Sequence, residues 1–252
     1  MPSPMDTTTP PGSDEVDPAG RRVYEDRWGV SGRIVQLRPH LWRDLAPSVA
    51  GGRVLEIGPG LRPTAPVGSS YFVETSQNAT VRLGRAGGRS VRVGGWQLPF
   101  QGGAFRGVLA LEILEHIDQD VEMLAEIVRV LEPRGVAAIS VPLHMDRWTA
   151  VDDMVHHVRR YDPADLLSKL RDAGLRPERY SARPSRSHPA MARIGVGMMS
   201  ALPRVSNWWL QHMVFPVQAV WQRRLERVGW RPIGEPIPAR AGGVMVLARA
   251  PG

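Results

Sequence analysis

Cysteine is absent from this chain, and its absence excludes several kinds of chemistry. Disulfide scaffolds, thiolate metal sites and cysteine nucleophiles all require this residue. Any chemistry that the chain carries must therefore come from histidine, carboxylates, hydroxyl groups or a bound cofactor.

Long apolar runs and targeting signals are missing as well. No stretch of roughly 18 or more apolar residues occurs, and the N-terminus lacks the basic segment and apolar segment that together mark secretion. We therefore expect a cytoplasmic protein that does not span a membrane.

Lysine is nearly missing: Lys169 is the only one, and arginine carries the remaining positive charge. The net charge is +7, and residues 171–252 hold 13 arginines against four acidic residues. A basic surface favours nucleic acid or anionic membranes as partners, but arginine in place of lysine is also typical of GC-rich genomes. We give the compositional explanation more weight, because net charge says little about fold.

What remains is an ordinary globular composition of 252 residues, 42% hydrophobic and 23% charged. Residues 1–20 are rich in proline and poor in large apolar side chains, so we expect a disordered tail there. A single domain is expected over 21–252, with N-terminal helices (21–50), a cofactor-binding core (51–186), a helical insertion (187–230) and a last strand (231–252). In the first part, Leu37, Leu41 and Leu45 recur at helical spacing.

After residue 50, short apolar runs alternate with helical patterns, which is typical of βαβ units. Seven such runs begin at residues 52, 69, 89, 106, 135, 176 and 242. We predict an α/β fold: a Rossmann-like, seven-stranded, mostly parallel sheet with flanking helices and a helical insertion before the last strand.

Two helices are clearly marked. In 118–135, Val121, Leu124, Val128 and Leu131 share a face, an aspartate at 118 or 120 is expected to cap the helix, and Pro133 and Gly135 are expected to stop it. In 161–175, Asp162 is the predicted N-cap, Pro163 takes the first helical position and Gly174 follows the helix. Leu166, Leu167 and Leu170 form the apolar face of this second helix.

A glycine turn, Gly58-Pro59-Gly60, follows the first predicted strand. Glycine allows positive φ and close approach of the backbone to a ligand, although a structural turn is an equally good explanation for this pair alone. The second strand ends at Glu74, whose carboxylate could accept both hydroxyls of a ribose. Together these features favour a cofactor that contains a nucleoside. The span from Gly60 to Tyr71 is too short and too rich in proline for the helix that a nicotinamide dinucleotide requires.

With these motifs the sequence resembles the class I S-adenosylmethionine-dependent methyltransferases, in particular the small-molecule group with the type 11 methyltransferase domain. The matching segments are VLEIGPG (54–60), LPF (98–100), LEHI (114–117), RVLEPRGVAAISVP (129–142) and HVRRYDPADLLSKLRDAGL (157–175). The resemblance implies S-adenosyl-L-methionine as cofactor, with its methionine part at Gly58 and Gly60 and its ribose at Glu74. The cofactor-binding residues that it implies are Glu56, Gly58, Pro59, Gly60, Glu74, Thr75, Leu98, Leu114 and Glu115.

Three departures from the family pattern are visible. Gly94 and Gly95 stand where such enzymes have an aspartate that meets the adenine amine, and Arg106 and Arg134 replace an aspartate and a glycine.

The methyl acceptor is expected near residues 114–116 and after the fifth strand, where a doubly wound fold exposes its ligand groups. The resemblance suggests His157 as a base, and His144 and His116 are further candidates, because a histidine with a pKa near ~6.5 takes up a proton at neutral pH. A solvated or packed histidine is the competing explanation for each. Substrate contacts are expected from Trp148, Tyr161 and Trp208. We expect no metal site, since the spacing of His144, Asp146, Asp152 and His156 matches no established pattern.

Residues 187–229 are apolar and rich in tryptophan and methionine. They either pack as a second helical layer or cover a hydrophobic acceptor, and Arg223, Arg224 and Arg227 suggest a peripheral membrane contact.

The sequence therefore predicts S-adenosylmethionine-dependent methyl transfer, by in-line displacement, to an O, N or C atom of a small hydrophobic molecule. Two alternatives stay open: a nucleic-acid methyltransferase, which the Leu-Glu-His-Ile segment disfavours, and a protein that has the fold without catalysis.

Overall fold

The computed structural model describes residues 34–36, 38–184, 196–197, 201 and 229–252. The predicted N-terminal tail, Trp208 and nearly all of the predicted insertion over 187–230 lie outside these residues.

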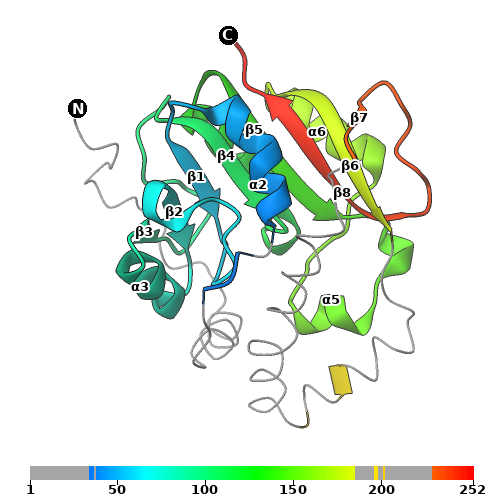
Figure 1. The fold of residues 1–252 in the computed structure, drawn as a ribbon. Coiled ribbons are helices and arrows are strands. Elements are labelled where there is room, and N and C mark those ends of the chain that lie inside the picture. Colours follow the sequence, from blue (N-terminus) through cyan, green and yellow to red (C-terminus); the bar gives the residue numbers. More distant parts are fainter. Residues whose placement is uncertain (1–33, 37, 185–195, 198–200, 202–228) are drawn as a thin grey trace.

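A mixed sheet of eight strands, in the order β3-β2-β1-β4-β5-β8-β6-β7, forms the centre of the described structure (Figure 1). The strands are β1 (Val54–Ile57), β2 (Tyr71–Glu74), β3 (Arg89–Arg92), β4 (Phe105–Leu111), β5 (Leu131–Pro142), β6 (Arg176–Pro184), β7 (Arg231–Pro232) and β8 (Ala241–Arg249). The first five pair in parallel, while β8 runs antiparallel between β5 and β6. The seven predicted strands are confirmed. The structure adds the short β7 beside β6, where two residues are too few to give a periodic pattern.

The central strands are buried along almost their whole length. Every residue of β1 and β2 is buried, and in β4 only Arg106 is exposed. Continuous apolar runs of this kind occur in parallel strands that are covered on both faces. β1 and β2 each contain one charged residue, Glu56 and Glu74, whose carboxylates are buried in this apolar layer.

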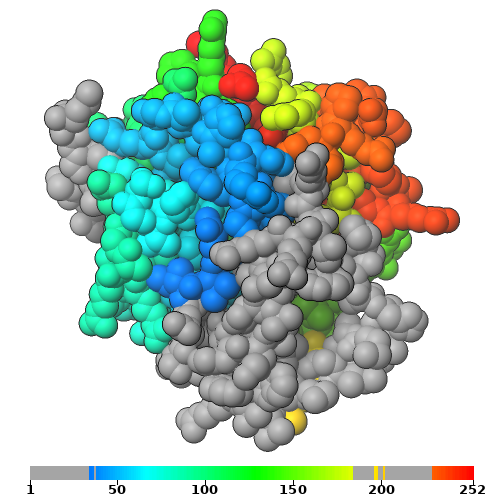
Figure 2. Space-filling model, viewed as in Figure 1, coloured from blue at the N-terminus to red at the C-terminus, as the bar shows by residue number. Residues whose placement is uncertain are grey.

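Helices cover both faces of the sheet (Figure 1). α2 (Pro39–Leu45) and α3 (Gln77–Arg85) lie on the face seen in Figure 2, where their leucines share one core cluster with Phe72 and Leu109. α4 (Asp120–Val130) and α6 (Pro163–Asp172) pack against the other face, in a second and larger cluster. The predicted helix with Leu41 and Leu45 is confirmed over Pro39–Leu45, while Leu37 lies outside the described residues.

α4 differs from its prediction in its buried face. Val121 is 54% exposed, while Met123, Leu124, Ile127 and Val130 are buried. The N-cap residue is Gln119, which makes no capping hydrogen bond through its side chain. Nor do Pro133 and Gly135 stop the helix, because β5 begins at Leu131 directly after it and includes both residues.

α6 follows its prediction closely. The Asp162 carboxylate accepts a hydrogen bond from the Ala164 N–H (2.8 Å), Pro163 opens the helix, and Gly174 follows it with φ of 91°. Leu166 and Leu170 are buried. Among the helices that the structure describes, none has the length and apolar character needed to cross a membrane.

Candidate active site

Two buried carboxylates of the described structure lie at or just after the carboxyl ends of strands: Glu74 ends β2, and Glu115 follows β4. The strand order reverses beside β1, since β2 and β3 lie on one side of it and β4 and β5 on the other. In open α/β sheets, ligands bind in the crevice at such a reversal. The candidate site is therefore built from the segments that follow β1, β2, β4 and β5.

The glycine turn after β1 has the backbone conformation that its composition predicts. Gly58 and Gly60 have φ of 59° and 57°, in the left-handed region that favours glycine. The Gly58 N–H donates to the Val73 carbonyl (2.8 Å), and the Gly60 N–H donates to the Glu74 carboxylate (2.7 Å). The turn thus joins the end of β1 to the end of β2.

Glu74 is 1% exposed, and its carboxylate is held mainly by backbone N–H groups, with a longer hydrogen bond from the Thr75 hydroxyl (3.5 Å). Oε1 accepts hydrogen bonds from the N–H groups of Thr75 (2.9 Å) and Ser76 (3.2 Å), and Oε2 accepts the one from Gly60. Burial raises the pKa of Glu74 above its ordinary value, against the opposing effect of these donors. Because a carboxylate oxygen can accept more than one hydrogen bond, Oε2 keeps capacity for a ligand hydroxyl.

The Glu56 carboxylate contacts the loop that follows Gly60. Its carboxylate accepts hydrogen bonds from the N–H groups of Thr64 and Ala65, each at 2.9 Å. Burial raises the pKa of Glu56 to about 7. The loop contains only a short 3-10 turn (Val67–Ser69) and no α-helix, as predicted. Glu56 therefore shapes the loop that begins at Gly60.

Leu98 is buried at 4% exposure, and α4 fixes it in place. Its N–H donates to the Glu126 carboxylate (2.8 Å), and its carbonyl accepts a hydrogen bond from Arg129 (2.8 Å). The LPF segment is thereby attached to α4, directly after the stretch that contains Gly94 and Gly95.

Glu112, which the sequence did not single out, follows β4 with φ of 60°. Its Oε1 accepts a hydrogen bond from Ser140 Oγ (2.7 Å) and pairs with the Arg183 guanidinium. Burial would raise the pKa of Glu112, but the charges of Arg183 and Arg38 and the hydrogen bonds from Ser140 and Arg183 together lower it. This ion pair joins the end of β4 to the end of β6.

The next turn, a 3-10 helix over Leu114–His116, places Glu115 completely inside the protein. Neither carboxylate oxygen of Glu115 has a hydrogen-bond partner in the described structure. Burial and the nearby Glu112 raise the pKa of Glu115 well above its ordinary value. Leu114 is also fully buried.

His157 lies against this turn. Its Nε2 is 3.8 Å from Glu115 Oε1, and its ring lies edge-on to that of His116 with the centroids 4.7 Å apart. Its Nδ1 is 2.8 Å from Asp152 Oδ1. Burial lowers the pKa of His157, although Asp152 raises it. The structure thus brings together two of the three predicted histidines.

Asp152 organises the segment that carries His157. It lies in α5 (Ala150–Met154), accepts hydrogen bonds from Arg160 (2.7 and 2.8 Å), and forms a capping box with Thr149. Burial would raise the pKa of Asp152, but these donors and His157 hold it well below its ordinary value. The Thr149-x-x-Asp152 spacing is a capping signal that the sequence offers. No sequence signal links Glu112 to Arg183, which lies on a distant strand.

The other predicted acceptor-side residues are placed differently. His144 lies two residues beyond β5 with φ of 65°, and its Nε2 is buried without a hydrogen-bond partner among the described residues. Tyr161 is 2% exposed, and its hydroxyl donates to Asp120 (2.8 Å), so it packs in the core. Trp148 is half-buried and donates to Asp153 (2.7 Å). Asp146 and His156 are exposed.

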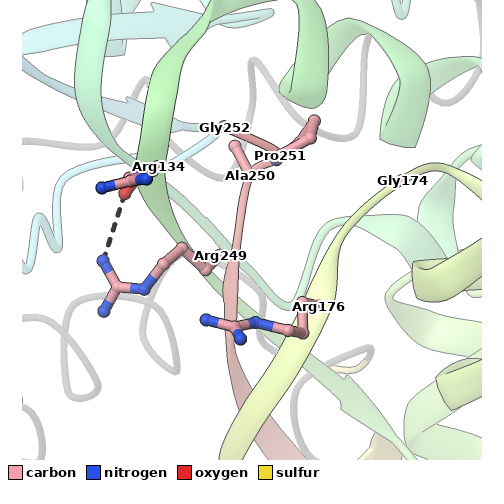
Figure 3. Close-up of a pocket in the computed structure, with 7 residues that line it drawn as sticks. All are labelled: Arg134, Gly174, Arg176, Arg249, Ala250, Pro251 and Gly252. Carbon is pink, nitrogen blue, oxygen red and sulfur yellow. Dashed lines mark hydrogen bonds between the residues drawn. The ribbon is translucent and has the colours of Figure 1, made fainter.

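A cavity of about 600 Å³ lies elsewhere, lined by Arg134, Gly174, Arg176, Arg249, Ala250, Pro251 and Gly252 (Figure 3). Arg134 lies near the start of β5, and Arg176 starts β6. The cavity is therefore at the amino ends of the parallel strands. In Figure 1 the C-terminus and α5 lie at opposite ends of the sheet. This cavity is separate from the candidate site.

Comparison with known proteins agrees with this geometry. Residues 58–139 match the methyltransferase domain family. An uncharacterized methyltransferase of Mycobacterium sp. (strain JLS) is 33% identical over 108 residues, which is 40% of this chain and 43% of that protein. The match therefore spans less than half of this relative.

Solved structures share the fold. An S-adenosylmethionine-dependent methyltransferase from Thermotoga maritima aligns with a TM-score of 0.54 at 14% identity, over 91% of this chain and 99% of that chain. The cyclase SpnF aligns with a TM-score of 0.55 at 17% identity, over 98% and 99% of the two chains. At such identities the likeness shows the fold alone, and the second example shows that this fold also supports a cyclase.

Proposed function

We propose that this chain, which contains a methyltransferase domain with the class I, S-adenosylmethionine-dependent fold, transfers a methyl group from S-adenosylmethionine to a small molecule. The observation that carries the proposal is the Gly58–Gly60 turn bound to the buried carboxylate of Glu74. It stands where the strand order reverses, and its residues lie within the segment that matches the methyltransferase domain.

The residues of this turn fit the cofactor. Oε2 of Glu74 accepts a single hydrogen bond in the described structure, so a ribose hydroxyl can donate to the same oxygen. Gly58 has φ of 59°, so a residue with a side chain is strained at this position of the turn. We assign the methionine part to Gly58, Pro59 and Gly60, and the ribose to Glu74 and Thr75.

When bound, S-adenosylmethionine supplies a methyl group on a positively charged sulfur. The chain contributes position: Glu56 holds the loop after Gly60, and Leu98 and Leu114 are buried in the core. Holding two reactants in line replaces a bimolecular encounter and is the main source of acceleration in such a transfer.

The acceptor is proposed to lie beside Glu115, His116 and His157, because these polar groups meet at the carboxyl end of β4. The chain around His157 also carries apolar side chains with solvent exposure: Met145 is 55% exposed, Val158 is 45% exposed, and Trp148 is half-buried. This surface favours a small, largely hydrophobic acceptor. The apolar composition of residues 187–229 favours the same kind of acceptor.

Isothermal titration of the full chain tests the cofactor assignment, with S-adenosylmethionine, S-adenosylhomocysteine and NADH as ligands. We expect both sulfur nucleosides to bind and NADH not to bind. Glu74→Gln should weaken binding about 10-fold or more, since hydrogen bonds to a charged group are worth roughly 1.5–3 kcal/mol. Glu122→Gln, on the exposed side of α4, is the matched control and should bind normally.

Absence of binding to either sulfur nucleoside would overturn the proposal. Binding without methyl transfer to any member of a panel of hydrophobic alcohols, amines and phenols would favour the alternative of a non-methylating protein with this fold.

A further inference from the structure

Three side chains that can bind a metal converge at the carboxyl end of β4. They are Glu115 and His116, in the 3-10 turn after the strand, and His157, which follows α5. One ligand atom from each lies within 4.8 Å of the others. Among the described residues, these three side chains form a cluster with the spacing of a metal site. Its members come from segments about 40 residues apart in sequence.

Backbone hydrogen bonds fix this approach. The Val158 N–H donates to the Glu115 carbonyl (2.8 Å), and the His157 N–H donates to the Asp152 carbonyl (2.9 Å). The Tyr161 hydroxyl lies 3.3 Å from the Leu114 carbonyl. The segment with His157 is therefore held against the turn with Glu115 by main-chain geometry, and the meeting of their side chains does not depend on long flexible groups.

The Glu115 carboxylate needs a positive partner. It is 0% exposed, and neither oxygen accepts a hydrogen bond in the described structure. His157 Nε2 is 3.8 Å from Oε1 of Glu115, which is too long for a hydrogen bond. A buried carboxylate without hydrogen bonds is costly unless it takes up a proton or binds a cation.

His157 is oriented as metal-binding histidines are. Its Nδ1 is 2.8 Å from Asp152 Oδ1, so Nδ1 carries the proton and Nε2 presents its lone pair toward Glu115. Asp152 is held in turn by Arg160. A carboxylate that binds the outer nitrogen of a histidine fixes the ring and increases the basicity of the inner nitrogen.

The charges around the cluster leave Glu115 as the ligand carboxylate. Arg160 pairs with Asp152, and Arg183 pairs with Glu112. Each of these arginines pairs with the acid beside it. The charge of Arg183 also acts on Glu115, but neither oxygen of the Glu115 carboxylate accepts a hydrogen bond from any of the described residues.

We propose that Glu115, His116 and His157 bind a divalent transition-metal ion. Two imidazole nitrogens and one carboxylate oxygen suit Zn²⁺, Co²⁺, Mn²⁺ or Fe²⁺, whereas Mg²⁺ and Ca²⁺ prefer oxygen ligands. Ligand atoms about 2.1 Å from one ion lie at most about 4.2 Å apart, so small rotations of these side chains complete the site. The inference does not depend on methyl transfer, because metal binding is measured by itself.

The test starts from the full chain stripped of metal with a chelator, titrated with Co²⁺ and followed by visible absorption, and with Zn²⁺ followed by calorimetry. We expect one equivalent to bind and to raise the thermal unfolding midpoint. Glu115→Gln and His157→Gln should each weaken binding by about 100-fold or more, and Asp152→Asn by about 10- to 100-fold. His156→Gln, one residue before the ligand and exposed, is the matched control and should bind normally.

Far-ultraviolet circular dichroism checks that each variant is folded, and the two ligand variants are read independently in case one is not. No stoichiometric binding of Co²⁺, Zn²⁺ or Mn²⁺ to the wild-type chain would overturn the proposal and assign a proton to Glu115. Undiminished binding by the folded ligand variants would also overturn it, because the ion would then lie elsewhere.

Discussion

Glu56, Glu74 and Asp152 are all nearly inaccessible to solvent, yet their surroundings shift their pKa values in different directions. Backbone N–H groups are the main donors to the first two, and burial outweighs them. Asp152 also has a guanidinium beside it, and this lowers its pKa. Of these three carboxylates, the one that is hydrogen-bonded to a guanidinium is the one whose pKa is lowered.

The raised pKa of Glu56 makes folding stability depend on pH. Between 4.5, its ordinary value, and about 7 the folded state binds a proton that the unfolded state has released, so the stabilisation is complete at low pH and is lost as pH rises. The free energy of unfolding of the wild type, relative to Glu56→Gln, should fall by up to about 3 kcal/mol between pH 4.5 and 8. Urea denaturation across this range measures it.

Glu122→Gln, an exposed change, serves as the control and should show no such slope against the wild type. Parallel curves for wild type and Glu56→Gln would show that Glu56 keeps an ordinary pKa.

Asp152→Asn tests the opposite case. Removing the carboxylate leaves Arg160 without its partner in a mostly buried position, and breaking such a pair costs about 3 kcal/mol or more. The lowered pKa means that this stabilisation is present above the ordinary value of 3.8 and is lost as pH falls through the folded pKa. At pH 7, thermal and urea unfolding should both show the loss. Asp146→Asn, at an exposed position, should stay within about 0.5 kcal/mol of wild type.

At the scale of elements, α4 shows which of two apolar faces a helix buries. Val121 and Val130 are the same residue type on the same helix, but one is 54% exposed and the other is fully buried. Val130→Ala should lower the free energy of unfolding by about 2 kcal/mol through a cavity, while Val121→Ala should change it by less than about 0.5 kcal/mol. Equal effects in urea denaturation would contradict the observed helix orientation.

The elements themselves were largely predictable. Seven strands follow from apolar runs between glycine and proline signals, and α6 follows from Asp162, Pro163 and Gly174, because these signals are local. The face of α4 was not predictable in the same way. Its sequence has apolar residues on two overlapping stripes, and packing against β5 and the rest of the larger core cluster selects between them.

In the candidate site too, residues marked by local sequence signals were predicted, and residues placed by long-range contacts were not. Gly58, Gly60 and Glu74 were predicted from residues that directly follow strands. His157 was proposed from a family resemblance. Its contact with Asp152 was not predicted, because the sequence around Asp152 shows a helix-capping signal and no catalytic motif. Glu112 was missed because its partners Ser140 and Arg183 come from two other strands.

At the scale of the whole molecule, β8 is the strand that completes the sheet. It pairs with β5 on one side and β6 on the other, and Val246 lies opposite Ile139 and Tyr180. Val246→Asp would bury an unpaired charge between both partners, so we expect loss of the cooperative unfolding transition in circular dichroism. Val81→Asp, on the partly exposed side of α3, should retain it. A cooperative transition in the Val246→Asp variant would mean that the fold does not require intact packing between β8 and its neighbours β5 and β6.

The position of β8 also has a consequence for synthesis. A ribosome makes β5 and β6 long before it reaches residue 241, and during that interval both strands expose unpaired backbone along the edges that β8 will join. Open edges of this kind pair readily with strands of other chains. The nascent protein therefore passes through a period in which it depends on chaperones or slow encounter rates to avoid aggregation, and slower translation of residues 185–240 would lengthen that period.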